Sequence, residues 1–264
     1  MIAASNQPGG PAPPIAEPSA NLVIRSLEKS FGGITALSDC SFEVRAGSIT
    51  ALIGPNGSGK TTLFNCVTGF YRPERGEVRF GGALLARLRP NEVVHLGIAR
   101  TFQITRIFKN MTVLENMIVP IRQIGLRTLF TAGIKGPERE RAEVLLEFFG
   151  IAFLRNELAG SLSFGQQKLL ELAAALMAEP KLLMLDEPAG GLNHTEIKGL
   201  GELIKRIRDE RRITILLVEH HMSMVMSICD KVVALDFGKK IAEGTPAQVQ
   251  NDEAVILAYL GTTK

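Results

Sequence analysis

The sequence predicts an α/β fold built on a largely parallel sheet. Three short apolar runs, residues 48–53, 182–185 and 213–218, have the composition of fully buried parallel strands. The first run leads through a glycine-rich turn into a helix expected over residues 62–67, and the other two are followed directly by polar residues. Because ligands of such sheets bind at the carboxyl ends of the strands, the functional residues are expected there.

The turn after the first strand has the pattern of a phosphate-binding loop, G-x-x-x-x-G-K-[ST]. The matching residues are Gly54, Pro55, Asn56, Gly57, Ser58, Gly59, Lys60 and Thr61, with Thr62 next in the helix. A strand, a glycine turn and a helix N-terminus direct backbone N–H groups at an anion, and the glycines let the backbone approach phosphate closely. Lys60 supplies a cation for the β- and γ-phosphates, and the Thr61 hydroxyl is placed to ligate Mg²⁺. This pattern predicts a nucleotide site.

The composition is that of an ordinary globular chain. At 264 residues it can form one large α/β domain or two small ones. The net charge of +3 arises from 30 basic and 27 acidic residues, without the clustered Lys and Arg of a nucleic-acid footprint. Three scattered cysteines, Cys40, Cys66 and Cys229, indicate reduced core thiols of a cytosolic protein, and no apolar run reaches the length of a membrane span. Residues 1–20 are expected to be a disordered leader and not a signal peptide.

Apolar periodicity and turn residues place the other elements. The expected strands are 22–27, 41–44, a hairpin over 76–82, a short strand over 97–103, and two antiparallel-looking strands at 230–235 and 240–243. The expected helices are 111–117, 139–149, 168–178, 195–208 and a helical tail over 246–260. Phe31 lies in the glycine-flanked turn between the first two strands, where either core packing or stacking on a base suits an aromatic ring.

The stretch between residues 104 and 147 differs in texture from the rest of the chain. Its first helix carries Thr112 and Glu115 at capping-box spacing, and its last helix is amphipathic and closed by Gly150. Between them, residues 118–137 mix glycines with large apolar residues. These apolar side chains either pack locally or form a docking surface for a partner, and the sequence favours neither alternative.

Two carboxylates, Asp186 and Glu187, end the buried strand at residues 182–185. Asp186 is suited to share Mg²⁺ with Thr61, since this ion takes one or two carboxylates together with phosphate oxygens and water. Glu187 is the better candidate for the base that polarises the attacking water, because a base must not be consumed as a metal ligand. Gln103 can contact the metal or water and His220 the γ-phosphate, but each position alone is equally typical of a structural side chain.

A second anion-binding helix terminus is expected at residues 162–167, where Ser163 and Gly165 lie immediately before a helix. One phosphate chain cannot easily meet both termini within a single chain when they lie on different subdomains. A head-to-tail dimer can use both, with each chain completing the nucleotide site of the other.

These motifs together resemble those of the ATP-binding subunit of an ABC transporter, over about residues 22–262. The phosphate loop, Gln103, and the stretches 162–167, 182–187 and 189–193, followed by His220, stand in the order of that family's motifs. The resemblance implies a RecA-like P-loop NTPase core with an antiparallel β subdomain and an α-helical signature subdomain. It implies one domain over residues 21–264, with the helical subdomain inserted at about 104–178.

The resemblance also implies roles for single residues, with ATP and Mg²⁺ as cofactors. Phe31 would stack on adenine, and Gln103 would sense Mg²⁺ and the transmembrane partner. Glu187 would be the general base and His220 the γ-phosphate contact. Residues of the signature stretch would meet the γ-phosphate of the opposite subunit's ATP, and these are Ser163, Gly165 and Gln166.

Within the family, the chain is similar to the G-type ATPase of branched-chain amino-acid importers. The similarity rests on Arg100–Gln103, Met111–Asn116, the insert after Val119, Glu187–Ala189, Gly191–Asn193, Val218–His220 and Ala258–Gly261. Three residues depart from the broad family. Phe164 replaces the second glycine of the broad family's signature, and a bulky aromatic residue there is similar to this subfamily. His221 stands where an acid is usual, and Gly190 stands where Ala or Ser is expected. Gly190 bears on coupling across the dimer interface and not on the ATP site.

The function implied is ATP hydrolysis that energises an importer, for branched-chain amino acids or a related amino acid, amide or small organic acid. The implied partners are a second ATPase subunit, identical or paralogous, two transmembrane permeases at residues 103–120, and a separate solute-binding protein. Nucleic acid is not an expected partner, and the location is the cytoplasmic face of the inner membrane. A soluble ABC ATPase acting on DNA or ribosomes needs a long coiled-coil insertion or two tandem cassettes, and the sequence shows neither. A phosphate-loop kinase needs an acceptor-substrate lid and explains neither the signature stretch nor Glu187.

Overall fold

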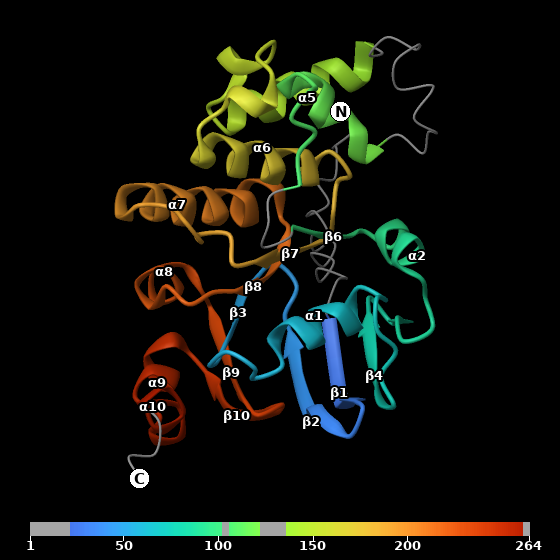
Figure 1. Ribbon diagram of the computed structural model, residues 1–264, viewed down its shortest axis with the longest axis vertical. Helices are drawn as coiled ribbons and strands as arrows, with labels where there is room; N and C mark the ends of the chain where they lie inside the picture. The colour runs from blue at the N-terminus through green and yellow to red at the C-terminus, as the bar shows by residue number, and fades with distance from the viewer. Residues whose placement is uncertain (1–21, 102–105, 122–135, 261–264) are drawn as a thin grey trace, which may run out of the picture.

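The computed structural model describes residues 22–101, 106–121 and 136–260, and all that follows concerns them. Their first part is an antiparallel sheet with the strand order β2-β1-β4-β5. The strands are β1 (Leu22–Phe31), β2 (Ile34–Val44), β4 (Arg75–Phe80) and β5 (Ala83–Leu84). This sheet forms the lower right of the molecule in Figure 1.

The first two strands are longer than expected. β1 runs on to Phe31 and β2 begins at Ile34, so that only Gly32 and Gly33 form the turn between them. Both glycines have positive φ, 52° and 89°, the conformation that two-residue hairpin turns require. The hairpin expected over residues 76–82 has different bounds in the structure. β4 occupies most of that segment, and the turn at Gly81 and Gly82 leads to its antiparallel partner β5.

The second sheet has six strands in the order β10-β9-β3-β8-β7-β6. The strands are β3 (Ile49–Ile53), β6 (Ile98–Arg100), β7 (Leu182–Asp186), β8 (Thr214–Val218), β9 (Lys231–Asp236) and β10 (Lys239–Gly244). All neighbouring pairs are parallel except β9 with β10. β9 is therefore antiparallel to β10, as expected, and also the outermost member of the parallel set.

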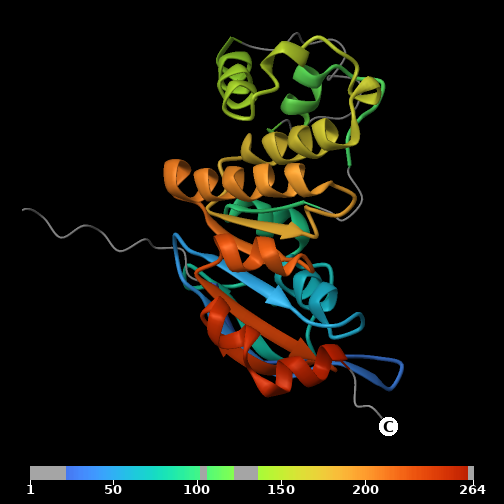
Figure 2. The same cartoon turned by 90° about the vertical axis from the view of Figure 1, so that its left-hand side faces the viewer.

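Helices lie on both sides of this sheet. They are α1 (Lys60–Val67), α2 (Pro90–His95), α3 (Val113–Ile118), α5 (Gly136–Phe148), α6 (Phe164–Leu176), α7 (His194–Arg211), α8 (Met222–Ile228), α9 (Pro246–Gln250) and α10 (Glu253–Leu260), with 3₁₀ turns at 119–121, 152–154 and 159–161. Figures 1 and 2 show α6 and α7 stacked above the sheet, with α1 and the antiparallel sheet below it. No helix in the described part of the chain is both long and apolar enough to cross a membrane.

The strand β7 lies next to the edge strand β6 and is packed on both faces. All five of its residues are buried. Leu183 and Leu185 join the core cluster that contains α6 and α7, whereas Leu182 and Met184 join the cluster that contains α1 and the antiparallel sheet. Alternate residues of a strand point to opposite faces, so β7 is packed from both sides and fixes the position of Asp186.

Side-chain caps set where several helices begin. The capping box predicted for Thr112 and Glu115 is confirmed, with Thr112 N donating to Glu115 Oε2 at 2.7 Å and Glu115 N donating to Thr112 Oγ1 at 3.2 Å. Another box, formed by Ser163 and Gln166, starts α6 at Phe164, four residues earlier than expected. Each such cap contributes about 1 kcal/mol.

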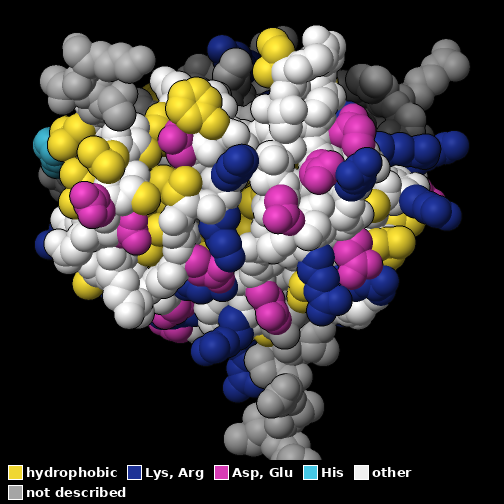
Figure 3. Space-filling model, turned by 90° about the horizontal axis from the view of Figure 1, so that it is seen from below, with side chains coloured by type: hydrophobic (Ala, Val, Ile, Leu, Met, Phe, Trp, Pro, Cys, Tyr) yellow, Lys and Arg dark blue, Asp and Glu magenta, His cyan; other side chains and the backbone are white. Residues whose placement is uncertain are grey.

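The tail is two helices and not one. α9 ends at Gln250, and Asp252 Oδ1 accepts a hydrogen bond from Ala254 N at 2.9 Å to start α10. Seen from below, hydrophobic side chains gather on the side where α9 and α10 lie, while acidic and basic side chains are interspersed over the rest of this face (Figure 3). The exposed apolar residues of α10 include Ile256, Leu257 and Leu260.

Candidate nucleotide-binding site

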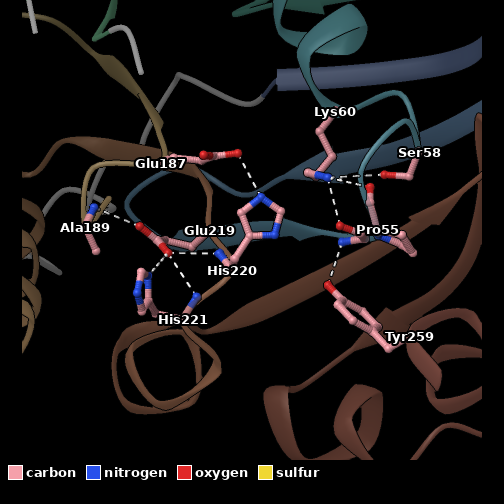
Figure 4. A network of polar contacts seen from close by, with 10 residues as sticks. Pro55, Ser58, Lys60, Glu187, Ala189, Glu219, His220, His221 and Tyr259 are labelled. Atoms are coloured by element: carbon pink, nitrogen blue, oxygen red, sulfur yellow. Dashed lines mark hydrogen bonds and ion pairs between the residues drawn. The ribbon is translucent and has the colours of Figure 1, made fainter. Parts of the chain in front are cut away.

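The loop between β3 and α1 is organised around Lys60. Its Nζ donates to the carbonyl oxygens of Gly54 and Pro55, each at 2.8 Å, and lies 3.4 Å from Ser58 Oγ (Figure 4). The residue is buried, and burial lowers the pKa of its ammonium, while the charges of Glu187 and Asp186 act in the opposite direction. The ammonium is therefore held inside the loop by carbonyls that a phosphate oxygen can replace.

Two glycines of the loop are required by neighbouring backbone. Gly54 has φ 148°, and a Cβ there would lie 2.1 Å from Leu235 O. Gly59 has φ 104°, and its Cβ would lie 2.5 Å from Ala36 O. The sequence interpretation explained these glycines by close approach to phosphate, and for Gly54 and Gly59 the structure adds a second reason within the protein itself. A Cβ at Gly57 meets nothing within 4 Å, so phosphate approach remains open there.

Asp186, at the carboxyl end of β7, pairs with Arg100 at the end of β6. Arg100 Nη2 lies 2.7 Å from Asp186 Oδ2, and both side chains are less than a tenth exposed. Arg100 also donates to Asn65 Oδ1 on α1 at 2.7 Å, so it links the acid to the helix that follows the phosphate loop. Sequence reasoning assigned Arg100 no role at the site; its place at a strand end, beside the acids, was the available signal.

Glu187 and His220 meet directly. His220 Nε2 lies 2.8 Å from Glu187 Oε1, and both side chains remain partly exposed. Glu187 has a left-handed φ of 49°, and its N–H donates to Val218 O at 2.9 Å. The two residues come from the ends of neighbouring strands β7 and β8, which is why separate positions in the sequence converge.

Phe31 is 41% exposed, which rules out the alternative of an ordinary core aromatic. Its ring contacts Tyr71 edge-on with centroids 5.1 Å apart, and Lys29 Nζ lies 4.9 Å from its centroid. The β9–β10 turn ties this sheet to the phosphate loop, because Gly238 N donates to Ser58 O and Gly238 O accepts from Ser38 N. Gln103 lies outside the described residues.

The signature stretch starts α6 through its own capping box. Ser163 Oγ accepts from Gln166 N at 3.3 Å, and Gln166 Oε1 accepts from Ser163 N at 3.0 Å. The ring of Phe164 fills the space over Gly191, where a Cβ would lie 2.8 Å from Phe164 Cε1. Gly165 lies against Glu196 of α7. In Figures 1 and 2, α6 lies above the sheet and α1 below it, so one chain does not bring these residues to its own phosphate loop.

Sequence reasoning missed two further residues. The hydroxyl of Tyr259, on α10, accepts a hydrogen bond from Gly54 N at 2.9 Å (Figure 4). Glu219 lies buried behind His220 and contacts three backbone N–H groups. A tyrosine in a C-terminal helix carries no positional signal of this contact. An acid directly after a buried strand does carry one, and it points to the same sheet edge as Asp186 and Glu187.

The chain belongs to the ABC transporter family of ATP-binding proteins, because the ABC transporter family model matches residues 37–190. It is accordingly an ATP-binding P-loop protein with the ATPase activity of its class. A second family model, for branched-chain amino acid ATP-binding cassette transporters, matches residues 239–264. The chain is 42% identical to the high-affinity branched-chain amino acid transport ATP-binding protein LivG of Salmonella typhimurium, over 91% of this chain and 97% of LivG.

Other comparisons agree. The chain is 43% identical to the corresponding transport protein BraF of Pseudomonas aeruginosa, over 91% of this chain and 97% of BraF. The ADP conformation of MJ1267, an ATP-binding cassette of an ABC transporter, superposes with a TM-score of 0.83 at 34% identity, covering 92% of this chain and 99% of that one. A nucleotide-free cassette from an ABC transporter gives a TM-score of 0.80 at the same identity and coverage. The predicted fold and family are confirmed.

Proposed function

We propose that this chain hydrolyses ATP to drive an importer of branched-chain amino acids or a closely related solute. The observation that carries the ATPase is the convergence of Lys60, Asp186, Glu187 and His220 at the carboxyl edge of one parallel sheet. The branched-chain cargo is supported by LivG and BraF, which match nearly over their full length, and by the family model at residues 239–264.

Mg²⁺ fits the oxygen donors that the site offers. Thr61 presents an exposed hydroxyl on the first turn of α1, and Asp186 presents a carboxylate that is fixed by Arg100. Hard oxygen ligands of this kind, with phosphate oxygens and water, are what Mg²⁺ prefers. When bound, the ion would neutralise charge on the β- and γ-phosphates. Lys60 would exchange its loop carbonyls for phosphate oxygens, and Phe31 would present its exposed ring to adenine.

Glu187 is proposed as the general base and His220 as the γ-phosphate contact. A carboxylate only accepts hydrogen bonds, so the proton between them belongs to His220 Nε2. That N–H cannot donate a full-strength hydrogen bond to Glu187 and to a phosphate oxygen at the same time. Binding of ATP therefore gives the proton donor to the phosphate and leaves Glu187 Oε1 to accept the proton of the attacking water.

The nucleotide is proposed to lie between two copies of the ATPase domain, or between this chain and a paralogue. Support comes from the separation of α6 from the phosphate loop within one chain (Figure 1). Ser163, Gly165 and Gln166 would then face the γ-phosphate held by the partner's loop, and Gln103 would complete the metal environment. The proposal includes a single ATPase domain over residues 21–264, with a helical subdomain at about 104–178. Its further partners are two permeases and a solute-binding protein. The chain is proposed to lie peripherally at the cytoplasmic face of the membrane.

Glu187→Gln tests the catalytic assignment. The variant is expected to bind ATP with wild-type affinity and to hydrolyse it at least about 100-fold more slowly, because an amide cannot take the proton from water. Phosphate release and binding of a fluorescent ATP analogue give the two readouts. Glu92→Gln, in the capping box of α2, is the matched control. Wild-type turnover in Glu187→Gln would refute the role of the base.

The shared site and the cargo need separate tests. Lys60→Ala and Ser163→Arg chains are each expected to be inactive, and mixing them should restore activity, because one site of each mixed dimer carries neither change. No recovery would contradict a site shared between two copies of this chain.

For the cargo, disrupting the gene should abolish uptake of labelled leucine by the cell, and unchanged uptake would contradict the proposed solute.

A further inference from the structure

Glu219 is a buried carboxylate at the point where β7 and β8 separate. The two strands pair in register up to Asp186 and Val218, and Glu187 N adds one more bond to Val218 O. Glu219 comes directly after Val218 and is 1% exposed. The regular strand pairing ends here, immediately before the loops that carry Glu187 and His220.

The side chain of Glu219 connects these loops beyond the end of the strands (Figure 4). Its Oε1 accepts the N–H of Ala189 at 2.8 Å, two residues after Glu187. Its Oε2 accepts the N–H groups of His220 at 2.8 Å and of His221 at 3.0 Å, and lies 2.9 Å from His221 Nδ1. A buried carboxylate is stable only with such partners, so this acid is matched to the two loops it joins.

The connection matters because the reacting side chains extend from loops and not from strands. Glu187 is held from one side by Val218 O and from the other by the turn in which Gly190 N donates to Glu187 O at 3.1 Å. His220 is held at its backbone N–H by Glu219. The 2.8 Å contact between the Glu187 and His220 side chains therefore depends on the spacing of two loops that the Glu219 carboxylate joins.

We propose that Glu219 is a positioning residue for ATP hydrolysis, which holds Glu187 and His220 at their working separation by binding the backbone of both loops. This inference rests on the proposed function, in which Glu187 is the base and His220 the γ-phosphate contact. The hydrogen bonds of Glu219 go to Ala189, His220 and His221, not to the phosphate loop. Its loss should therefore lower kcat and leave ATP binding intact.

Two substitutions remove the connection in different ways. Glu219→Gln keeps the shape but replaces one acceptor oxygen with an NH₂ donor, so it cannot accept from both loops at once. Glu219→Asp keeps the charge but is one methylene shorter, so it cannot span them. Each should lower kcat at least tenfold and change the dissociation constant of a fluorescent ATP analogue less than threefold. His221→Ala, which removes only the Nδ1 contact, should lower kcat less than threefold.

Wild-type kcat in both Glu219 variants would overturn the proposal. So would a loss of ATP affinity equal to the loss of kcat, or failure of both variants to fold in a thermal unfolding scan, because these results mark a merely structural role. The double variant Glu187→Gln/Glu219→Gln should lose less activity than the product of the two single losses, and fully multiplicative losses would contradict action through the pair of Glu187 and His220. Full turnover in Glu187→Gln alone refutes the proposed base, whatever the Glu219 variants do.

Discussion

Single residues at this site adopt conformations that are unfavourable in isolation. Glu187 has φ 49°, in the left-handed region that costs a residue with a side chain on the order of 1–2 kcal/mol. The conformation persists because Glu187 N and O are both hydrogen-bonded, to Val218 and Gly190. The side chain is thus directed away from the line of β7 and toward His220, where a regular strand would not place it.

Lys60 gives the prediction at this scale. Wild-type protein at 100 times the dissociation constant of ATP should gain about 2.7 kcal/mol of unfolding free energy. Lys60→Ala should gain almost none, because the cation for the β- and γ-phosphates is absent. Thermal unfolding with and without ATP measures both, and Lys198→Ala, on the exposed face of α7, is the control. An unchanged ATP-induced shift in Lys60→Ala would contradict the phosphate-loop assignment.

At the scale of elements, the last helix is coupled to the first turn of the phosphate loop. Tyr259 Oη accepts the N–H of Gly54, and burial raises the pKa of the Tyr259 phenol, so the group stays a neutral hydroxyl over the physiological range. α10 is thereby connected to the end of β3, about 200 residues earlier in the chain. Its position bears on the loop although none of the residues predicted to bind the nucleotide lies on it.

Tyr259→Phe tests this coupling. Loss of the hydroxyl leaves the N–H of Gly54 without its acceptor, and the expected cost is about 1–3 kcal/mol of unfolding free energy with a several-fold weaker ATP affinity. Urea unfolding and binding of the ATP analogue measure these quantities. The chain has one other tyrosine, Tyr71, and Tyr71→Phe keeps the ring against Phe31, so it should change neither. Equal behaviour of the two variants would show that the hydroxyl contributes nothing.

Local patterns in the sequence predicted the elements well, and contacts between distant segments poorly. Composition and length identify β3, β7 and β8, because a strand buried on both faces must be largely apolar. The same patterns stopped β1 before Phe31, since Lys29 and Ser30 are polar and are held extended by pairing with β2 and by bonds to Glu74. The role of Gly54 in admitting Leu235 O, and the contact of Tyr259, depend on segments that are adjacent only in the folded chain.

At the scale of the whole molecule, the three thiols report on global unfolding. Burial raises the pKa of Cys40 to about 12, of Cys66 to about 11 and of Cys229 to about 12. These pKa values lie above those of the same thiols in the unfolded chain. As the pH rises, the thiols therefore lose their protons in the unfolded state before they do so in the folded state. Their contribution to stability is complete below about pH 9 and declines as the pH rises toward 11 or 12.

The expected loss at pH 10 is on the order of 1 kcal/mol of unfolding free energy per thiol. Urea unfolding at pH 8 and pH 10 measures it, and the triple variant Cys40→Ala/Cys66→Ala/Cys229→Ala should show a smaller difference between the two. A thiol reagent at pH 8 should not label the buried Cys40 and Cys66 until the protein unfolds, whereas the partly exposed Cys229 can react earlier. Rapid labelling of Cys40 or Cys66 in the native chain would contradict their burial.

Gly238 affects the distance between two parts of the proposed nucleotide site. Gly238 joins the strand after Phe31 to the loop of Lys60, through bonds to Ser38 and Ser58 of 2.9 and 3.1 Å. A Cβ at this position would lie 2.7 Å from Ala36 O, so the joint has no slack. In the proposed site, where Phe31 stacks on adenine and the loop of Lys60 binds the phosphates, these bonds link the two parts to each other. A free base or a free polyphosphate would fill only one end of this distance, so each is expected to bind more weakly than ATP.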